Sequence, residues 1–267
     1  MPRDGAGDTI ANPCGLRPIV GPGHRAARIR PAPETRLPRQ VTAGSPERIF
    51  PAMATIAGFP NLTVLDHPLI QHKLTLLRDR HTTSRDFKAL VSEIAMLMGY
   101  EVTRDLATEP VTIETPLERM TGTLVPGKRV ILVPILRAGL GMVEGLIQLI
   151  PSARVGHIGL VRDEETHAAS RYYFKLPSLA EASDFLVLDP MLATGGSAVK
   201  ACTALKEAGA ARLRFLALVA APEGVRCLYE AHPDVPVFVA ALDRGLDERA
   251  YILPGLGDAG DRLFGTL

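Results

Sequence analysis

Residues 185–198 read Phe-Leu-Val-Leu-Asp-Pro-Met-Leu-Ala-Thr-Gly-Gly-Ser-Ala. Phe185 to Leu188 form a short apolar run, which is typical of a strand buried on both faces of a sheet. After Ser197 the chain continues with a helical pattern that stops at Gly209, a residue type common at helix C-termini. We therefore expect a strand, a loop and a helix, with the loop at the amino end of the helix.

The loop has the chemistry of a phosphate site. Helix N-termini direct free backbone N–H groups and the positive end of the helix dipole at an anion. Thr194 and Ser197 add hydroxyls, and the adjacent glycines let an anion approach the backbone. The spacing of the glycines fits neither the loop that binds nucleoside triphosphates nor the motif Gly-x-Gly-x-x-Gly. The Asp189 carboxylate suits the hydroxyls of a sugar, so a phosphorylated ribose fits both the carboxylate and the loop. The alternative is an ordinary turn that is rich in small residues.

The segment Asp-Pro-Met-Leu-Ala-Thr-Gly-Gly-Ser resembles the phosphoribosyl-diphosphate (PRPP) loop of the type I phosphoribosyltransferases, in the form found in the uracil-specific enzymes. Most type I members carry two acidic residues before this loop. Pro190 replaces the second, which is characteristic of the uracil enzymes, and the resemblance extends over about Leu62 to Leu267. It implies that PRPP is bound by the nine residues Asp189, Pro190, Met191, Leu192, Ala193, Thr194, Gly195, Gly196 and Ser197.

A second strand, loop and helix places an arginine at a strand end. The apolar run that begins at Lys128 leads into Arg137, and a helix is expected from Val143 to Ile150. Ligands of open α/β sheets bind at the carboxyl ends of strands, and a guanidinium matches phosphate oxygens. If this segment is considered alone, a solvent-exposed arginine in a turn between a strand and a helix explains the pattern better. The resemblance implies that Arg137 contacts the pyrophosphate, that Arg162 also contacts PRPP, and that Arg137 and Asp189 are the catalytic residues.

The end of the chain reads Tyr-Ile-Leu-Pro-Gly-Leu-Gly-Asp-Ala-Gly-Asp-Arg-Leu-Phe-Gly-Thr over residues 251–266. Its glycines predict a loop lined by backbone, whose amides and carbonyls can match the edge of a pyrimidine and leave a wrong base unpaired. A frayed terminus is the alternative. The segment resembles the uracil loop of the family, which implies that Ile252, Gly257, Asp258 and Ala259 bind uracil and that Asp258 also lies near PRPP.

The remaining patterns predict an α/β protein with a doubly wound, mainly parallel sheet flanked by helices, because strands alternate with helices. This is the type I phosphoribosyltransferase fold that the resemblance implies. A capping box at Thr83–Asp86 predicts a long amphipathic helix to about Leu106. Further expected elements are an edge strand at 111–115, a hairpin flap at 162–177, strands at 212–220 and 235–242, and a helix at 222–232. The acidic run 163–165 is interpreted as a solvated loop.

Composition excludes several classes of protein. The chain has 267 residues, 46% of them hydrophobic, and a net charge of +1, which gives no reason to expect nucleic acid or membrane partners. No apolar run approaches the ~20 residues that span a bilayer. Cys14, Cys202 and Cys227 are odd in number and widely spaced. They indicate no disulfide framework and no metal cluster, so a reducing compartment, the cytoplasm, is expected.

The first segment differs from the rest. Residues 1–52 hold eight arginines against four acidic residues, a charge of +4, whereas the remainder holds 22 basic and 25 acidic residues, a charge of −3. The segment also contains nine of the 22 prolines. Such a composition predicts disorder. We place a disordered Pro/Arg-rich extension at 1–58 and a phosphoribosyltransferase domain at 59–267. Translation from Met53 and a transit peptide are the alternatives.

The resemblance implies a pentosyltransferase of pyrimidine salvage that converts uracil and PRPP to uridine 5′-monophosphate (UMP) and pyrophosphate. It implies Mg²⁺ as cofactor, held mainly by PRPP and not by protein ligands, and a homo-oligomer, either a dimer or a tetramer. GTP is an effector in some members. An RNA-binding regulator on this scaffold, a pseudo-enzyme and a transferase for another base are the alternatives. The sequence identifies no general base for uracil N1.

Overall fold

The apolar runs of the sequence lie in one sheet, described here from a computed structural model. The structure describes residues 55–56, 58–126, 129–162, 169–178 and 184–266, and all of these belong to one compact unit, Phe50–Leu267. The side chains of 161–162 and 169–171 lie outside this description. So does nearly all of the predicted extension at 1–58, of which only Thr55, Ile56 and Gly58 are described.

The sheet is mainly parallel, as predicted. Its strands follow the order β1-β2-β12-β11-β9-β5-β7-β8, with β10 beside β11 and β6 beside β5. The pairs β1–β2 and β7–β8 are antiparallel, and the other pairs are parallel. The bounds are β1 Thr55–Ile56, β2 Phe59–Val64, β5 Val130–Leu136, β6 Arg154–Val155, β7 His157–Arg162, β8 Ala169–Lys175, β9 Asp184–Leu188, β10 Met191–Leu192, β11 Arg212–Ala220 and β12 Val237–Leu242.

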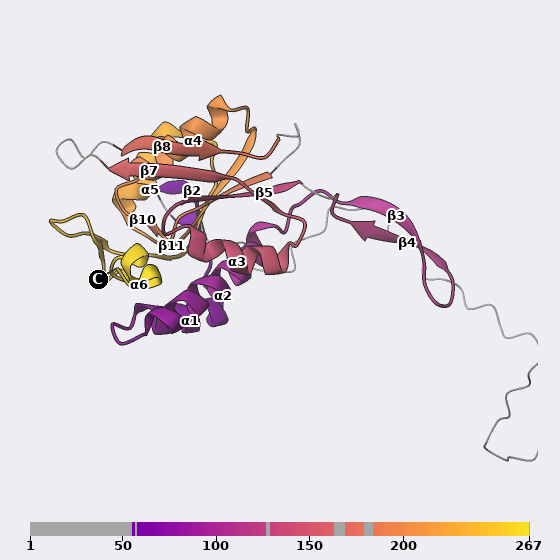
Figure 1. Ribbon diagram of the computed structural model, residues 1–267, viewed down its shortest axis with the longest axis horizontal. Coiled ribbons are helices and arrows are strands. Elements are labelled where there is room, and N and C mark those ends of the chain that lie inside the picture. Colours follow the sequence, from indigo (N-terminus) through magenta and orange to yellow (C-terminus); the bar gives the residue numbers. More distant parts are fainter. Residues whose placement is uncertain (1–54, 57, 127–128, 163–168, 179–183, 267) are drawn as a thin grey trace, which may run out of the picture. The chain divides into compact units, whose positions relative to one another are not determined.

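Helices cover both faces of this sheet (Figure 1). One core lies under α1 (Pro68–Arg78), α2 (Ser84–Val102), α3 (Leu140–Leu149) and α6 (Ala259–Phe264), and the other lies under α4 (Gly196–Glu207) and α5 (Pro222–Ala231). Successive strand side chains point to opposite faces. In β9, Leu186 and Leu188 join the first core, whereas Phe185 and Val187 join the second. Burial on both faces explains why the central strands are continuous apolar runs.

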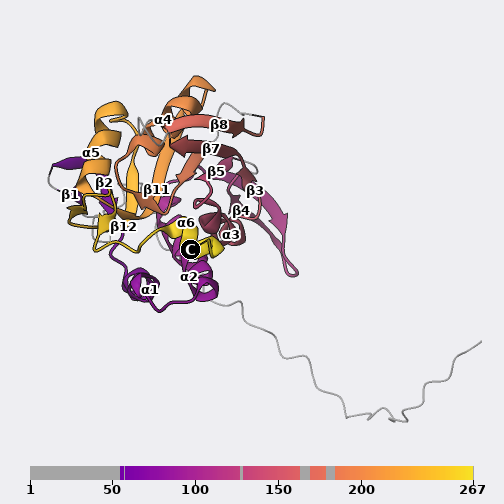
Figure 2. The same cartoon turned by 60° about the vertical axis from the view of Figure 1, so that its left-hand side comes forward.

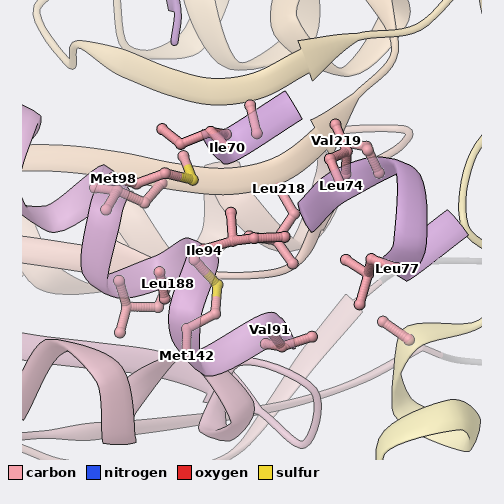
Figure 3. Packing of buried hydrophobic residues seen from close by; sticks show 14 of the residues in the cluster. Ile70, Leu74, Leu77, Val91, Ile94, Met98, Met142, Leu188, Leu218 and Val219 are labelled. Atoms are coloured by element: carbon pink, nitrogen blue, oxygen red, sulfur yellow. The ribbon is translucent and has the colours of Figure 1, made fainter. Parts of the chain in front are cut away.

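The helix α2 follows the predicted capping pattern at its start. The Thr83 hydroxyl accepts a hydrogen bond from the backbone N–H of Asp86 at 3.2 Å. The helix ends at Val102, four residues before the predicted end, where the Thr103 hydroxyl donates to the Gly99 carbonyl at 2.7 Å. Figure 3 shows Val91, Ile94 and Met98 of α2 in the core formed with α1 and the sheet. Within the described part of the chain, no helix is long and apolar enough to cross a bilayer.

The segment expected as an edge strand lies in a separate hairpin instead. β3 (Glu109–Glu114) pairs antiparallel with β4 (Arg119–Leu124), and neither strand belongs to the main sheet. Most residues of both strands are exposed, and Figures 1 and 2 show the hairpin extending away from the sheet. The alternating pattern predicted a strand correctly, but it does not specify the pairing partner, which the neighbouring sequence provides through a short turn.

The predicted hairpin excursion after Arg154 is present at the sheet edge. β7 and β8 pair antiparallel, with His157 opposite Lys175 and Arg162 opposite Ala169. The tip of this hairpin, residues 163–168, lies outside the described residues, and with it the acidic run that we interpreted as a solvated loop.

Candidate active site

The candidate site lies where the order of the sheet reverses direction. From β5 the chain moves to one side through α3 to β7, and it then returns to the other side of β5 for β9, β11 and β12. Such a switch point leaves a crevice at the carboxyl ends of the two central strands. β5 and β9 are neighbours with Pro134 opposite Leu188. Arg137 and Asp189 therefore follow adjacent strand ends.

The loop after β9 is held by the neighbouring strand β11. The Pro190 carbonyl accepts hydrogen bonds from the N–H groups of Leu218 and Val219 at 3.0 and 3.1 Å, and the Leu192 carbonyl accepts one from Ala221 at 2.9 Å. Gly195 follows with φ +85° and is the N-cap of α4. The first N–H groups of a helix have no partner within it, so this turn directs free donors and the positive end of the dipole into the crevice.

The first turn of α5 packs directly beneath this loop. A Cβ at Gly224 would lie 2.6 Å from the Leu192 carbonyl oxygen, so only hydrogen fits there. A Cβ at Gly195 would lie 2.8 Å from the Gly224 carbonyl oxygen and from the Cys227 Cβ. The loop at 189–197 and α5 thus approach each other closely at both glycines, which fixes the distance between them.

Asp189 lies half-buried at the end of β9. Burial raises the pKa of Asp189 from 3.8 to about 7, because the ionised carboxylate loses hydration. A hydrogen bond from the Met191 N–H opposes this shift, and the nearby charge of Asp258 adds to it. The carboxyl group therefore changes charge near neutral pH, and it interacts electrostatically with a residue of the distant C-terminal segment.

The C-terminal segment forms a hairpin, a loop and a short helix. β13 (Gly245–Leu246) pairs with β14 (Ile252–Leu253), and the Asp247 carboxylate closes the intervening turn by accepting from the N–H groups of Arg249 and Tyr251. The predicted backbone-lined loop is shorter than expected, because α6 begins at Ala259. Its N-cap is Asp258, whose carboxylate accepts from the Asp261 N–H at 3.0 Å.

A cavity of about 280 Å³ joins the two segments. Its wall combines residues of the phosphate loop with residues of the hairpin and of the C-terminal loop. Ile252 and Asp258 of the predicted uracil loop face the same space as Thr194 and Ser197. The lining residues are Asp189, Met191, Leu192, Ala193, Thr194, Gly195, Ser197, Ala198, Arg249, Ala250, Tyr251, Ile252 and Asp258.

Four further predicted residues, Pro190, Gly196, Gly257 and Ala259, lie next to these lining residues in the sequence. Pro190 and Ala259 are buried, and Gly257 is exposed.

Arg137 lies beside α6 and is not among the residues that line the cavity. Its guanidinium carbon is 5.9 Å from the centre of the Phe264 ring, and the side chain is exposed. A Cβ at Gly260 would lie 4.0 Å from the Cβ of Ala138, so the loop after β5 reaches the first turn of α6. Arg162 is the last residue of β7, but its side chain lies outside the described residues.

Sequence reasoning did not assign a role to Arg249 and Tyr251, which line the cavity. Tyr251 is the first residue of the quoted segment but received no role, and a segment extended upstream by two residues would have included Arg249 as well. Gly224 is also missing from the predicted site, and its contact with Leu192 has no signal in the sequence because it depends on how α5 packs.

The residues of the cavity do not form a metal-binding cluster. Among the described residues, no group of three or more His, Cys, Asp or Glu side chains could hold a metal ion. Asp189 and Asp258 are the carboxylates of the cavity. Two carboxylates are few for a Mg²⁺ ion bound by protein alone, but they suit an ion that arrives on a phosphate-bearing ligand.

A parallel sheet with a helix N-terminus, a carboxylate and an arginine at its switch point assigns the chain to the type I phosphoribosyltransferases. A family model described as uracil phosphoribosyltransferase matches residues 64–266. The chain belongs to the uracil phosphoribosyltransferase family.

Known proteins agree with this assignment. The uracil phosphoribosyltransferase of Anoxybacillus flavithermus is 58% identical over 203 residues, which cover 76% of this chain and 97% of that protein. The uracil phosphoribosyltransferase of Bacillus thuringiensis is 57% identical over 205 residues, covering 77% and 98%. Among solved structures, the AQ2163 protein of Aquifex aeolicus is similar with a TM-score of 0.73 at 35% identity, over 76% of this chain and 97% of that one.

Proposed function

We propose that this chain transfers the 5-phosphoribosyl group of PRPP to uracil, which yields UMP and pyrophosphate for pyrimidine salvage. The observation that carries the proposal is the shared cavity: Thr194 and Ser197 of the phosphate loop and Asp258 of the C-terminal loop line one space. A phosphate and a base bound at these two loops would be joined by a ribose above Asp189.

The proposed roles rest on the family resemblance and on the chemistry of each group. The loop from Asp189 to Ser197 binds PRPP, with the N–H groups at the start of α4 on the 5′-phosphate. The Asp189 carboxylate binds ribose hydroxyls and stabilises positive charge that develops on the ring. Arg137 and Arg162 bind the diphosphate, for which a planar guanidinium is well suited.

The uracil loop supplies backbone rather than side-chain contacts. Ile252, Gly257 and Ala259 present backbone N–H and carbonyl groups to the pyrimidine edge, and Asp258 lies between the base and PRPP. The exposure of Gly257, next to the buried Ala259, favours this role. A base with the wrong pattern of donors and acceptors would leave these groups unpaired at a cost of about 1–3 kcal/mol each.

The reaction breaks the bond between the anomeric carbon and a diphosphate oxygen and forms a bond between that carbon and uracil N1. The electron pair of the broken bond leaves with pyrophosphate, and the N1 proton is lost to solvent. When bound with PRPP, Mg²⁺ neutralises charge on the leaving group. No residue of the cavity is assigned as a dedicated base. Catalysis is therefore attributed to positioning and to electrostatic stabilisation.

A base-competition assay tests this function. PRPP is incubated with uracil, cytosine, orotate or hypoxanthine, and nucleotide formation is followed. We expect UMP as the main product. A transferase for another base would prefer one of the other three, and a pseudo-enzyme would form no nucleotide.

Four further features belong to this proposal. The catalytic domain covers 59–267, and a Pro/Arg-rich extension covers 1–58. The enzyme acts in the cytoplasm as a homo-oligomer, and GTP is a candidate effector. Gel filtration with and without GTP, together with initial rates at a low PRPP concentration, tests the assembly and the effector in one series.

A further inference from the structure

The peptide groups just before the proposed uracil loop are held by side chains from distant parts of the chain. Gly255 donates its N–H to the Asp243 carboxylate at 2.9 Å, and its carbonyl accepts from the Arg78 guanidinium at 2.7 Å. Asp243 follows β12, and Arg78 is the last residue of α1. The backbone N–H and the backbone carbonyl of Gly255 are thus bound by an acidic and a basic side chain that also contact each other.

The contact between Arg78 and Asp243 is a two-point ion pair. Nη1 and Nη2 of Arg78 lie 2.8 and 2.7 Å from the two Asp243 oxygens. Only 21% of the Arg78 side chain and 5% of the Asp243 side chain are exposed. An ion pair this far out of water is sensitive to geometry, because losing one partner leaves the other charge buried and unpaired. It therefore holds the Gly255 backbone in one place.

A second arginine binds the next carbonyl along the chain. Arg262 of α6 donates to the Leu256 carbonyl at 2.7 Å and to the Asp79 carbonyl at 2.6 Å. Its guanidinium also lies 4.2 Å from the centre of the Phe87 ring on α2. Consecutive carbonyls, at 255 and 256, are thereby tied to the corner between α1 and α2.

These contacts leave a short, exposed piece of backbone between two fixed points. On one side, residues 255 and 256 are buried and held by the two arginines. On the other side, Asp258 caps α6, whose Ala259 and Leu263 are buried. Gly257 lies between them and is exposed. The direction of its peptide groups is set by the two fixed points rather than by contacts of its own.

We propose that Arg78, Asp243 and Arg262, the anchoring cluster, are positioning residues that set the orientation of the uracil loop and thereby the affinity for uracil. The proposal rests on the assignment of residues 257–259 to uracil made above. The three residues act through the Gly255 and Leu256 backbone, and they contact neither the phosphate loop nor the residues after β5 by any hydrogen bond described here.

Kinetics that separate the two substrates test this proposal. In Asp243→Asn and Arg78→Lys the ion pair loses its two-point geometry, since an ammonium cannot span both carboxylate oxygens and the Gly255 carbonyl. We expect the KM for uracil to rise by up to about 10²-fold, the effect of a displacement of about 1 Å at a reacting group. The KM for PRPP is expected to stay at the wild-type value. Arg262→Lys provides an independent test of the Leu256 contact.

A matched control is available at the amino end of β9, the end of this strand that lies away from the candidate site. Asp184 is similarly buried, with 8% of its side chain exposed, and it pairs with Arg212 at 3.0 Å at the start of β9. Asp184→Asn is expected to lower the melting temperature without changing either KM. If Asp243→Asn does not fold, Arg78→Lys and Arg262→Lys decide the question.

The result distinguishes this proposal from the assignment of the loop itself. Gly257→Ala perturbs the loop directly, because Gly257 has φ +79°. If Gly257→Ala raises the KM for uracil while the three cluster variants leave it unchanged, the positioning role is wrong and the loop assignment stands. If none of the four variants changes it, the loop assignment is wrong. Equal increases in both KM values for the cluster variants would show a general structural role and overturn the proposal.

Discussion

The two halves of the cavity are held in place in different ways. The phosphate loop at 189–197 is supported by its immediate neighbours, through backbone hydrogen bonds to β11 and a close approach to α5. The C-terminal loop at 254–258 is supported by side chains far away in sequence, with Arg78 lying 177 residues from Gly255. If the loops bind phosphate and base as proposed, phosphate binding depends on regular secondary structure, and base binding depends on a few charged side chains. Substitutions in the two halves should have separable effects.

The largest effect is expected where the diphosphate would bind. Arg137→Ala removes the exposed guanidinium at the end of β5. We expect turnover to fall by about 10²–10³-fold, the loss typical for a donor that stabilises charge in the transition state. The melting temperature should hardly change, because an exposed side chain is removed. Turnover with saturating PRPP and uracil measures this, and near-normal turnover would contradict the role of Arg137.

A substitution in α5, beneath the loop at 189–197, should change the kinetics for PRPP without changing the kinetics for uracil. In Gly224→Ala the added methyl group lies 2.6 Å from the Leu192 carbonyl oxygen, so the loop must move. We expect the KM for PRPP to rise by about 10²-fold. The KM for uracil at saturating PRPP should be unaffected. Gly122→Ala in β4, whose nearest neighbour would be 3.7 Å away, is the control. If both variants behave alike, the contact with α5 does not position the loop.

The Asp189 carboxyl group, which lines the cavity, should make the free energy of unfolding depend on pH. The pKa of Asp189 is raised to about 7 in the folded state, so folded protein holds this proton more tightly than unfolded protein does. Stability from this group is then lost as pH rises from about 4 through 7. Asp189→Asn should be more stable than the wild type at pH 8, by up to about 4 kcal/mol, and the difference should disappear near pH 4.

Melting temperatures of the Asp189→Asn variant and the wild type across this range provide the measurement. Asp258→Asn offers a second check, because removing the neighbouring charge should lower the pKa of Asp189. A difference between Asp189→Asn and the wild type that is independent of pH would contradict the raised pKa.

A smaller effect is expected in the turn of the hairpin. Ala250 has φ +64°, a conformation that residues with a Cβ rarely adopt. Ala250→Gly should stabilise the protein by about 0.5–1 kcal/mol, because relief of this strain exceeds the entropy cost of glycine. Chemical denaturation measures the difference. Destabilisation by the glycine would show that the Ala250 methyl group has favourable contacts in the cavity that outweigh the strain.

The smallest effect concerns the first part of the chain. Both halves of the cavity come from residues within 64–266, the range that the family model matches. A protein that begins at Met53 should therefore have unchanged kcat and unchanged KM values for both substrates. Any loss of activity would give the preceding residues a role in catalysis or assembly.

The same contrast explains what the sequence could predict. The strand, the loop and the helix around Asp189 have local signals, namely an apolar run, adjacent glycines and a helical period, so the sheet and this strand-loop-helix unit were predicted correctly. The binding of phosphate by the loop stays a prediction. The capping of α2 by Thr83 was predicted for the same reason. The pairing of β3 with β4 was not, because alternation gives a strand but not its partner.

The supports of the C-terminal loop have no such local signal. Arg78 and Asp243 are a single arginine at a helix end and a single acid after a strand, 165 residues apart. The helix α6 was missed because Asp258 was interpreted as a loop residue, although it caps that helix. Glycine spacing identified the loop, and tertiary packing determines its conformation.

A crystal structure of the complex with UMP would show whether the two loops of the cavity bind the phosphate and the base of one nucleotide. We predict that the phosphate binds at the N–H groups that follow Thr194, that the ribose hydroxyls lie at Asp189, and that the base edge meets the backbone of residues 257–259. A nucleotide whose base lies away from those residues while its phosphate occupies the loop before α4 would contradict the account.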